Sequence, residues 1–142
     1  MPLISEDVVA QLKQEFSELK NPVRLQVFSQ ALADPQSEQV KRLVEELAAI
    51  DAKLTATSYN FVLDKAEAEA LGIQRIPAIA VLGETKDYGI RMYGLPSGYD
   101  FGVLVDAILD VSRGESVLQP ETRQALAALD RNVHVQVFST PT

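Results

Sequence analysis

Residues 27–48, VFSQALADPQSEQVKRLVEELA, place an apolar strand pattern before a short polar turn and a helix. In the helical part, apolar residues recur every three or four positions, at Val40, Leu43, Val44 and Leu47. Asp34 is predicted to cap this helix, with Pro35 at its first position. A strand that runs into a helix N-terminus often carries chemistry in α/β proteins, yet this turn has no cysteine, histidine, lysine or glycine-rich loop.

The remaining sequence patterns extend this unit in both directions. They predict helices over residues 5–19, 36–50, 65–71, 101–111 and 120–130, and strands over 23–28, 55–63, 78–82, 89–93 and 133–139. Asp64 is expected to cap the helix over 65–71, and Gly72 to lie just past its end. Strands and helices that alternate in this way indicate an α/β fold.

Length and charge narrow the class of protein. The chain has 142 residues, 46% of them hydrophobic, which is enough for one domain with a proper core. Its net charge of −7 disfavours binding to nucleic acid or to an anionic membrane surface. The N-terminus lacks the pattern of a signal peptide, and no apolar run is long enough to span a membrane. We therefore expect a cytoplasmic protein.

The sequence contains no cysteine, which excludes disulfides, thiolate nucleophiles and thiolate metal sites within these residues. Its one histidine, His134, lies in the alternating pattern VHVQVF and is interpreted as a partly buried or solvated strand residue. No metal site and no cofactor are expected.

Two segments far apart in the chain are similar to each other. Residues 23–29 read VRLQVFS and residues 133–139 read VHVQVFS, identical at five of seven positions. Each follows an amphipathic helix and a short break, so a helix-strand unit recurs after 110 residues. The pattern predicts that a second copy of the fold begins near Gln119. The alternative is that two strands share so apolar a sequence by chance.

The order of elements resembles a known family. The order β-α-β-α-β-β-α, with Ile76-Pro77 opening the third strand, is similar to the thioredoxin fold. More narrowly, the chain resembles the N-terminal half of the glutaredoxin-like protein disulfide oxidoreductases, which carry two thioredoxin folds in tandem. The resemblance covers most of the chain and rests on LKNPVRLQVF, VKRLVEELAAIDAKL, ALGIQRIPAIAVLG, GIRMYGLPSGYDF, LVDAILDVSRG and LDRNVHVQVFSTPT. The N-terminal domain of the flavoprotein component of alkyl hydroperoxide reductase, which fuses one cysteine-less and one active thioredoxin fold, is a less close match.

The resemblance implies where chemistry is expected. Members of the family exchange disulfides through a Cys-x-x-Cys at the start of the helix that follows the first strand of a repeat. Those cysteines correspond to Asp34 and Ser37, so no catalytic residue is expected in this chain. Asp34 lies where a helix N-terminus stabilises negative charge, as it does for a thiolate. A role for Asp34 as general acid or base is the weaker alternative, because no histidine, lysine or second carboxylate has a suitable spacing.

The resemblance also implies a groove for an extended peptide. Pro77 is expected to be cis, and Ile76, Pro77 and Gly94 are expected to line a groove that pairs with a substrate strand. The alternative is that the cis bond remains only because the fold was built around it.

We therefore expect a thioredoxin-like α/β domain over residues 1–118, with a central mixed sheet flanked by helices and an extra N-terminal helix. Residues 119–142 are expected to start a second, truncated thioredoxin-like repeat. The expected function is a redox-inactive scaffold or protein-binding module of a protein disulfide oxidoreductase-type protein. The alternative is an N-terminal fragment of an active dithiol-disulfide oxidoreductase whose Cys-x-x-Cys follows Thr142.

Three partners are expected: a protein or peptide substrate, the second thioredoxin-like repeat, and a second copy of the chain. The last follows because an unpaired strand over VHVQVF favours dimerisation. A glutathione-binding domain that uses Ser37 is a further alternative. It is weaker, since the strand after Pro77 leads into GETKDYGI rather than the Glu-Ser pair by which such proteins hold the γ-glutamyl group.

Overall fold

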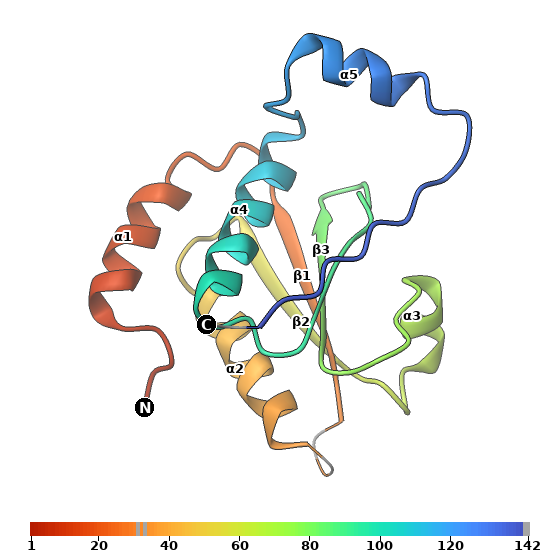
Figure 1. The fold of residues 1–142 in the computed structure, drawn as a ribbon. Helices are drawn as coiled ribbons and strands as arrows, with labels where there is room; N and C mark the ends of the chain where they lie inside the picture. The colour runs from red at the N-terminus through yellow and green to blue at the C-terminus, as the bar shows by residue number, and fades with distance from the viewer. Residues whose placement is uncertain (31, 33, 141–142) are drawn as a thin grey trace.

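The computed structural model describes residues 1–30, 32 and 34–140, which form an α/β structure (Figure 1). Its helices are α1 (Glu6–Phe16), α2 (Pro35–Ala48), α3 (Lys65–Ala70), α4 (Tyr99–Arg113) and α5 (Pro120–Ala127). Its strands are β1 (Val23–Ser29), β2 (Leu54–Asn60), β3 (Ala78–Gly83) and β4 (Ile90–Tyr93). Within these described ranges, no helix has the length and hydropathy needed to cross a membrane.

The four strands form one mixed sheet in the order β2-β1-β3-β4. β1 and β2 are parallel, with Val23 opposite Leu54 and Ser29 opposite Asn60. β3 runs antiparallel to both β1 and β4. β1, β2 and β4 therefore end, and β3 begins, at the same end of the sheet. We call this end, with the residues that follow β1, β2 and β4 and precede β3, the site end. This arrangement confirms the expected thioredoxin-like fold.

The larger core lies between the sheet and the three helices α1, α2 and α4, which cover one face of it (Figure 1). Its main buried members include Phe16, Val23, Leu25, Val27, Val40, Leu47, Ile79, Leu104 and Ile108. On the other face, α3 covers a smaller cluster of Phe28, Ala68, Ile73 and Ala78. Successive residues of a strand point to opposite faces, so the neighbours Val27 and Phe28 belong to different clusters.

Local signals set the ends of the helices. The hydroxyl of Ser5 accepts a hydrogen bond from the amide of Val8, and two acidic residues follow in the first turn of α1. α4 ends at Gly114, whose φ of +71° is the left-handed conformation that glycine adopts without strain. The predicted position of Gly72, just past the end of α3, is confirmed.

Two local predictions at the end of β2 are wrong. The strand expected over 55–63 ends at Asn60, because the Asn60 side chain accepts hydrogen bonds from the amides of Val62 and Leu63 and turns the chain. Asp64 occupies the position before α3 without capping it. Its carboxylate accepts instead from the amide of Asn60, at 2.8 Å.

The predicted strand over 133–139 is also wrong. Residues 133–139, all of them described, belong to no strand ladder, and His134 is an exposed residue of an irregular segment. The predicted helix is confirmed as α5, which has no buried residue and stands apart from the sheet in Figure 1. These residues resemble β1 in sequence and lack the neighbouring strands and helices that bury β1. Pro141 and Thr142, the last two residues of the expected second repeat, lie outside the described part of the chain.

Candidate functional site

The turn between β1 and α2 holds the two positions that correspond to the family cysteines. Asp34 is the N-cap of α2, and one of its carboxylate oxygens accepts from the amide of Gln36 at 3.0 Å. Its other carboxylate oxygen accepts from the Ser37 hydroxyl, also at 3.0 Å. The two side chains are therefore joined directly by a hydrogen bond. Ala31 and Ala33, earlier in the turn, lie outside the described residues.

This pair lacks the groups that thiol or nucleophilic chemistry needs. Ser37 is fully buried, and its hydroxyl proton is donated to a carboxylate that also caps the helix. Oxygen cannot replace sulfur in disulfide exchange, and the sequence has no cysteine. The chain is thus redox-inactive toward disulfides. Among the residues described, no group of three or more histidine, cysteine or acidic side chains is arranged to hold a metal ion.

The second part of the site lies where β3 begins. The Ile76-Pro77 bond is cis, as expected. The amide of Gly94 donates to the carbonyl of Pro77 at 2.9 Å, so the predicted closeness of these two residues is confirmed. Ala78 pairs with Phe28 of β1, which places Pro77 beside the end of β1 from which the chain leads to Asp34. No hydrogen bond between the Asp34–Ser37 pair and residues 76–94 is found among the described residues.

Exposed apolar residues that no sequence pattern predicts surround this end of the sheet. Leu32 follows β1, Val62 and Leu63 follow β2, and Tyr93 ends β4, and all four side chains are exposed. We call these four residues the apolar rim. The amide of Phe61 donates to the carbonyl of Ser29 at 2.9 Å, which keeps the segments after β1 and β2 side by side. The only sequence signal for Val62 and Leu63 was apolar character, which we interpreted as strand.

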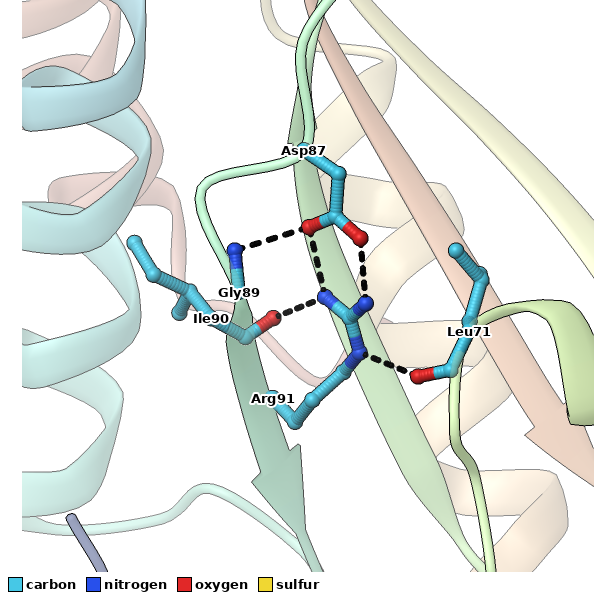
Figure 2. A network of polar contacts seen from close by, with 5 residues as sticks. All are labelled: Leu71, Asp87, Gly89, Ile90 and Arg91. Carbon is cyan, nitrogen blue, oxygen red and sulfur yellow. Dashed lines mark hydrogen bonds and ion pairs between the residues drawn. The ribbon is translucent and has the colours of Figure 1, made fainter. Parts of the chain in front are cut away.

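An ion pair between Asp87 and Arg91 lies toward the opposite end of the sheet. Figure 2 shows the Arg91 guanidinium donating two hydrogen bonds to the Asp87 carboxylate, at 2.9 and 2.5 Å, and a third to the Leu71 carbonyl at 3.0 Å. The hydrogen bond from Arg91 holds the pKa of Asp87 below its usual range, although partial burial opposes this shift. These contacts tie β4 to the loop after α3, and we assign them a structural role.

A cavity of about 440 Å³ lies on the α1 side of the molecule. It is lined by Leu3, Ile4 and Val8 from the N-terminal segment, by Leu43 of α2, and by Leu95 and Phe101 around the start of α4. No pattern in the sequence predicts it. The N-terminal segment is held against α2 because the amides of Leu3 and Ile4 both donate to the Glu46 carboxylate at 2.9 Å.

No protein-family model matches the chain. Among curated proteins, it is 31% identical over 110 residues to an NADH dehydrogenase of Bacillus subtilis, covering 78% of this chain and 19% of that protein. It is 27% identical over 137 residues to the alkyl hydroperoxide reductase AhpF of Staphylococcus epidermidis, covering 96% of this chain and 24% of the relative. The chain therefore spans about a quarter or less of the curated relatives that it matches.

Solved structures give the same relationship. An N-terminal domain of the alkyl hydroperoxide reductase AhpF from Enterococcus faecalis has a TM-score of 0.81 at 27% identity, over 90% of this chain and 62% of that one. A protein disulfide oxidoreductase from Aeropyrum pernix has a TM-score of 0.78 at 26% identity, over 88% and 55%. The sequence resemblance predicts a closer match to the oxidoreductases than to the reductase. The TM-scores and identities do not confirm this, because the reductase domain matches at least as closely as the oxidoreductase.

A thioredoxin from Fasciola hepatica shares the fold alone, with a TM-score of 0.52 at 16% identity over 70% of this chain and 89% of that one. The matches to the reductase domain and to the oxidoreductase cover 90% and 88% of this chain, more than the match to the thioredoxin. The chain is therefore a thioredoxin-like domain that is related to the N-terminal domain of the alkyl hydroperoxide reductase AhpF and to a protein disulfide oxidoreductase, and it contains no cysteine.

Proposed function

We propose that this domain is a protein-binding module or scaffold that holds an extended polypeptide at the site end of the sheet. Ile76, Pro77 and Gly94 form the floor of the binding surface, and the apolar rim flanks it. The domain presents a polypeptide to a redox-active partner and takes no part in electron transfer.

One observation carries this proposal. The thiol positions have become a closed, hydrogen-bonded helix cap, whereas the four side chains of the apolar rim at the same end of the sheet are exposed. None of the hydrogen bonds found among the described residues uses the backbone of Ile76, although its neighbour Pro77 is bonded to Gly94. Exposed apolar side chains gathered beside an unpaired backbone segment are typical of a surface that binds an extended chain.

Titration with an unfolded polypeptide tests this binding directly. Reduced and alkylated insulin B chain serves as the probe, and amide NMR shifts of the domain serve as the readout. We expect shifts at Ile76 and Gly94 and at the rim. Leu63→Lys should weaken binding about tenfold by removing apolar burial, whereas Val117→Lys, an exposed valine outside the surface, should have no effect. Equal binding by both variants, or shifts confined to other surfaces, would reject the proposal.

Restoring the thiols tests the assignment of Asp34 and Ser37. A variant with Asp34→Cys and Ser37→Cys should form an internal disulfide and gain insulin-reduction activity, which the unmodified chain should lack. The control carries Glu38→Cys and Lys41→Cys, at the same spacing within α2 but past its N-terminus. If the control gains the same activity, the position at the helix N-terminus has no special role.

A second candidate is that the chain is one part of a longer, active dithiol oxidoreductase. The alignment with the reductase of Staphylococcus epidermidis covers nearly all of this chain but only 24% of that relative. Under this proposal, residues 1–118 form one domain and residues 119–142 are the start of a second repeat. The complete second repeat is then the partner of the domain over 1–118. Reading the codons that follow Thr142 in the source gene tests this second candidate. It requires that they encode a Cys-x-x-Cys.

A further inference from the structure

Arg75 lies at the site end and places a cation beside the proposed polypeptide surface. It directly precedes Ile76, whose backbone makes none of the hydrogen bonds found among the described residues. The guanidinium carbon of Arg75 lies over the ring of Tyr93, 5.0 Å from the ring centroid. This cation–π contact holds the side chain against the last residue of β4, which is also a member of the apolar rim.

Arg75 differs from the other arginines of the chain in its contacts. The other six each donate a hydrogen bond or form an ion pair: Arg24, Arg42, Arg91, Arg113, Arg123 and Arg131. Within the described residues, the exposed Arg75 side chain does neither. A guanidinium is a planar fork with five N–H donors, which matches the two oxygens of a carboxylate. Arg75 is therefore an anchored cation whose donors are available to a ligand.

The sheet register places this cation on the face that α3 covers. A row of paired residues crosses the four strands here, made of Tyr59, Phe28, Ala78 and Tyr93. Paired residues of neighbouring strands point to the same face. Since Phe28 and Ala78 belong to the cluster under α3, the ring of Tyr93 and the guanidinium over it lie on that side of the sheet.

None of the acidic side chains at the site end is paired with Arg75 in the described structure. Asp34 caps α2 and Asp100 lies in the first turn of α4, and these two helices cover the opposite face (Figure 1). Asp64 accepts from the amide of Asn60 at the end of β2, and β2 and β4 are the two opposite edges of the sheet. The net charge of −7 does not attract an anion at long range, so an anion is recognised here by direct hydrogen bonds.

We propose that Arg75 binds an acidic side chain of the extended polypeptide that the site end holds. This inference rests on the proposed function and specifies its ligand, which is an extended segment with a carboxylate among apolar side chains. The backbone of the segment lies beside Ile76, its apolar side chains contact the apolar rim, and its carboxylate accepts hydrogen bonds from the guanidinium. Because Tyr93 already holds Arg75 in place, less side-chain freedom is lost when the carboxylate binds.

Two peptides that differ at one position test this preference. Each alternates valine and serine, with a single glutamate near the middle of one and a glutamine at the same place in the other. Both are blocked at their ends, so that the glutamate is the only carboxylate. Amide NMR shifts at Ile76 and Gly94 measure the two dissociation constants. We expect the unmodified chain to bind the glutamate peptide about three- to tenfold more tightly than the glutamine peptide.

Two variants of the domain locate the origin of the preference. Arg75→Gln should bind the two peptides equally and should bind the glutamine peptide as the unmodified chain does, because it removes only the cation. Lys86→Gln is the matched control. Lys86 also lies over a tyrosine ring, that of Tyr88, but in the loop between β3 and β4 at the other end of the sheet. This variant should keep the full preference.

Three outcomes would overturn the inference: equal binding of the two peptides by the unmodified chain, a glutamate preference that Arg75→Gln leaves unchanged, or an equal loss of that preference in Lys86→Gln. The glutamine peptide separates this inference from the proposed function. If both peptides shift the amides of Ile76 and Gly94 without a preference, only the present inference fails. If neither these peptides nor the insulin B chain shift them, both fail.

Discussion

Asp34 shows how a single side chain can stabilise a site that has lost its thiols. Its two carboxylate oxygens accept from the amide of Gln36 and from the buried Ser37 hydroxyl. Asp34→Ala should lower the free energy of unfolding by about 1–3 kcal/mol, because it removes a helix cap and leaves a buried hydroxyl without its acceptor. Urea denaturation measures the change.

Asp34→Asn is the matched control for this prediction. Asparagine caps helices about as well as aspartate and keeps an oxygen that can accept from Gln36. We expect a loss of about 1 kcal/mol or less. If both variants unfold like the unmodified chain, the hydrogen bonds of Asp34 do not stabilise the turn.

Asp87 gives a pH dependence whose sign follows from its contacts. Arg91 holds the pKa of Asp87 below its ordinary value of 3.8, so the folded state favours the charged carboxylate. This stabilisation is present above the unfolded pKa and is lost as the pH falls through the lower, folded one. The stability advantage of the unmodified chain over Asp87→Asn should therefore be constant above about pH 5 and shrink below about pH 4.

Denaturation midpoints between about pH 2.5 and 7 measure this difference. Glu84→Gln is the control, because this substitution removes the same charge from the same loop and Glu84 has no ion pair with Arg91 in the described structure. An advantage over Asp87→Asn that is the same at every pH would contradict the assigned contact.

At the scale of elements, Ser112 joins parts of the chain that are far apart in sequence. This buried residue of α4 accepts from the amides of Lys20 and Asn21 at 2.9 and 3.1 Å and donates to the Asn21 carbonyl at 2.8 Å. It thereby fixes the turn between α1 and β1. No sequence pattern predicted it, because one serine in an apolar helix carries no signal of a partner 91 residues away.

Ser112→Ala should therefore destabilise the fold by about 1–3 kcal/mol, since it removes the three hydrogen bonds that the buried Ser112 hydroxyl makes with the turn. Thermal and urea unfolding measure this loss. Ser116→Ala is the matched control, because Ser116 is exposed and its hydroxyl accepts from the nearby amide of Leu118. Equal effects from the two variants would mean that the buried contact adds nothing.

The elements also show where sequence patterns succeed. Four of the five predicted strands and all five helices form, because their periodicity, caps and glycines act locally. The strand over 133–139 fails although it closely resembles β1, because a strand needs neighbours and this segment has none in the described structure. Whether a segment forms a strand depends on the strands beside it, and the sequence of the segment alone does not provide these.

For the molecule as a whole, the sequence and its family resemblance predicted the fold, the helix cap at Asp34 and the closeness of Pro77 and Gly94. They did not predict the apolar rim, because its members lie at or after the ends of three separate strands that only the sheet order brings together. They also missed the network of Asp87, Arg91 and Leu71, because only the fold brings the Leu71 carbonyl, 20 residues away in sequence, within reach of Arg91.

The distribution of buried residues leads to a prediction about the whole chain. Every buried residue of the described structure lies between Ile4 and Ser112, and residues 115–140 are exposed throughout. A chain of residues 1–118 should therefore fold cooperatively, with a free energy of unfolding within about 1 kcal/mol of the full chain at a concentration where both are monomeric. Urea denaturation and amide NMR spectra of the two chains make the comparison. A large loss of stability, or spectra that differ around β1 and α4, would mean that residues 119–140 are part of this domain's own structure.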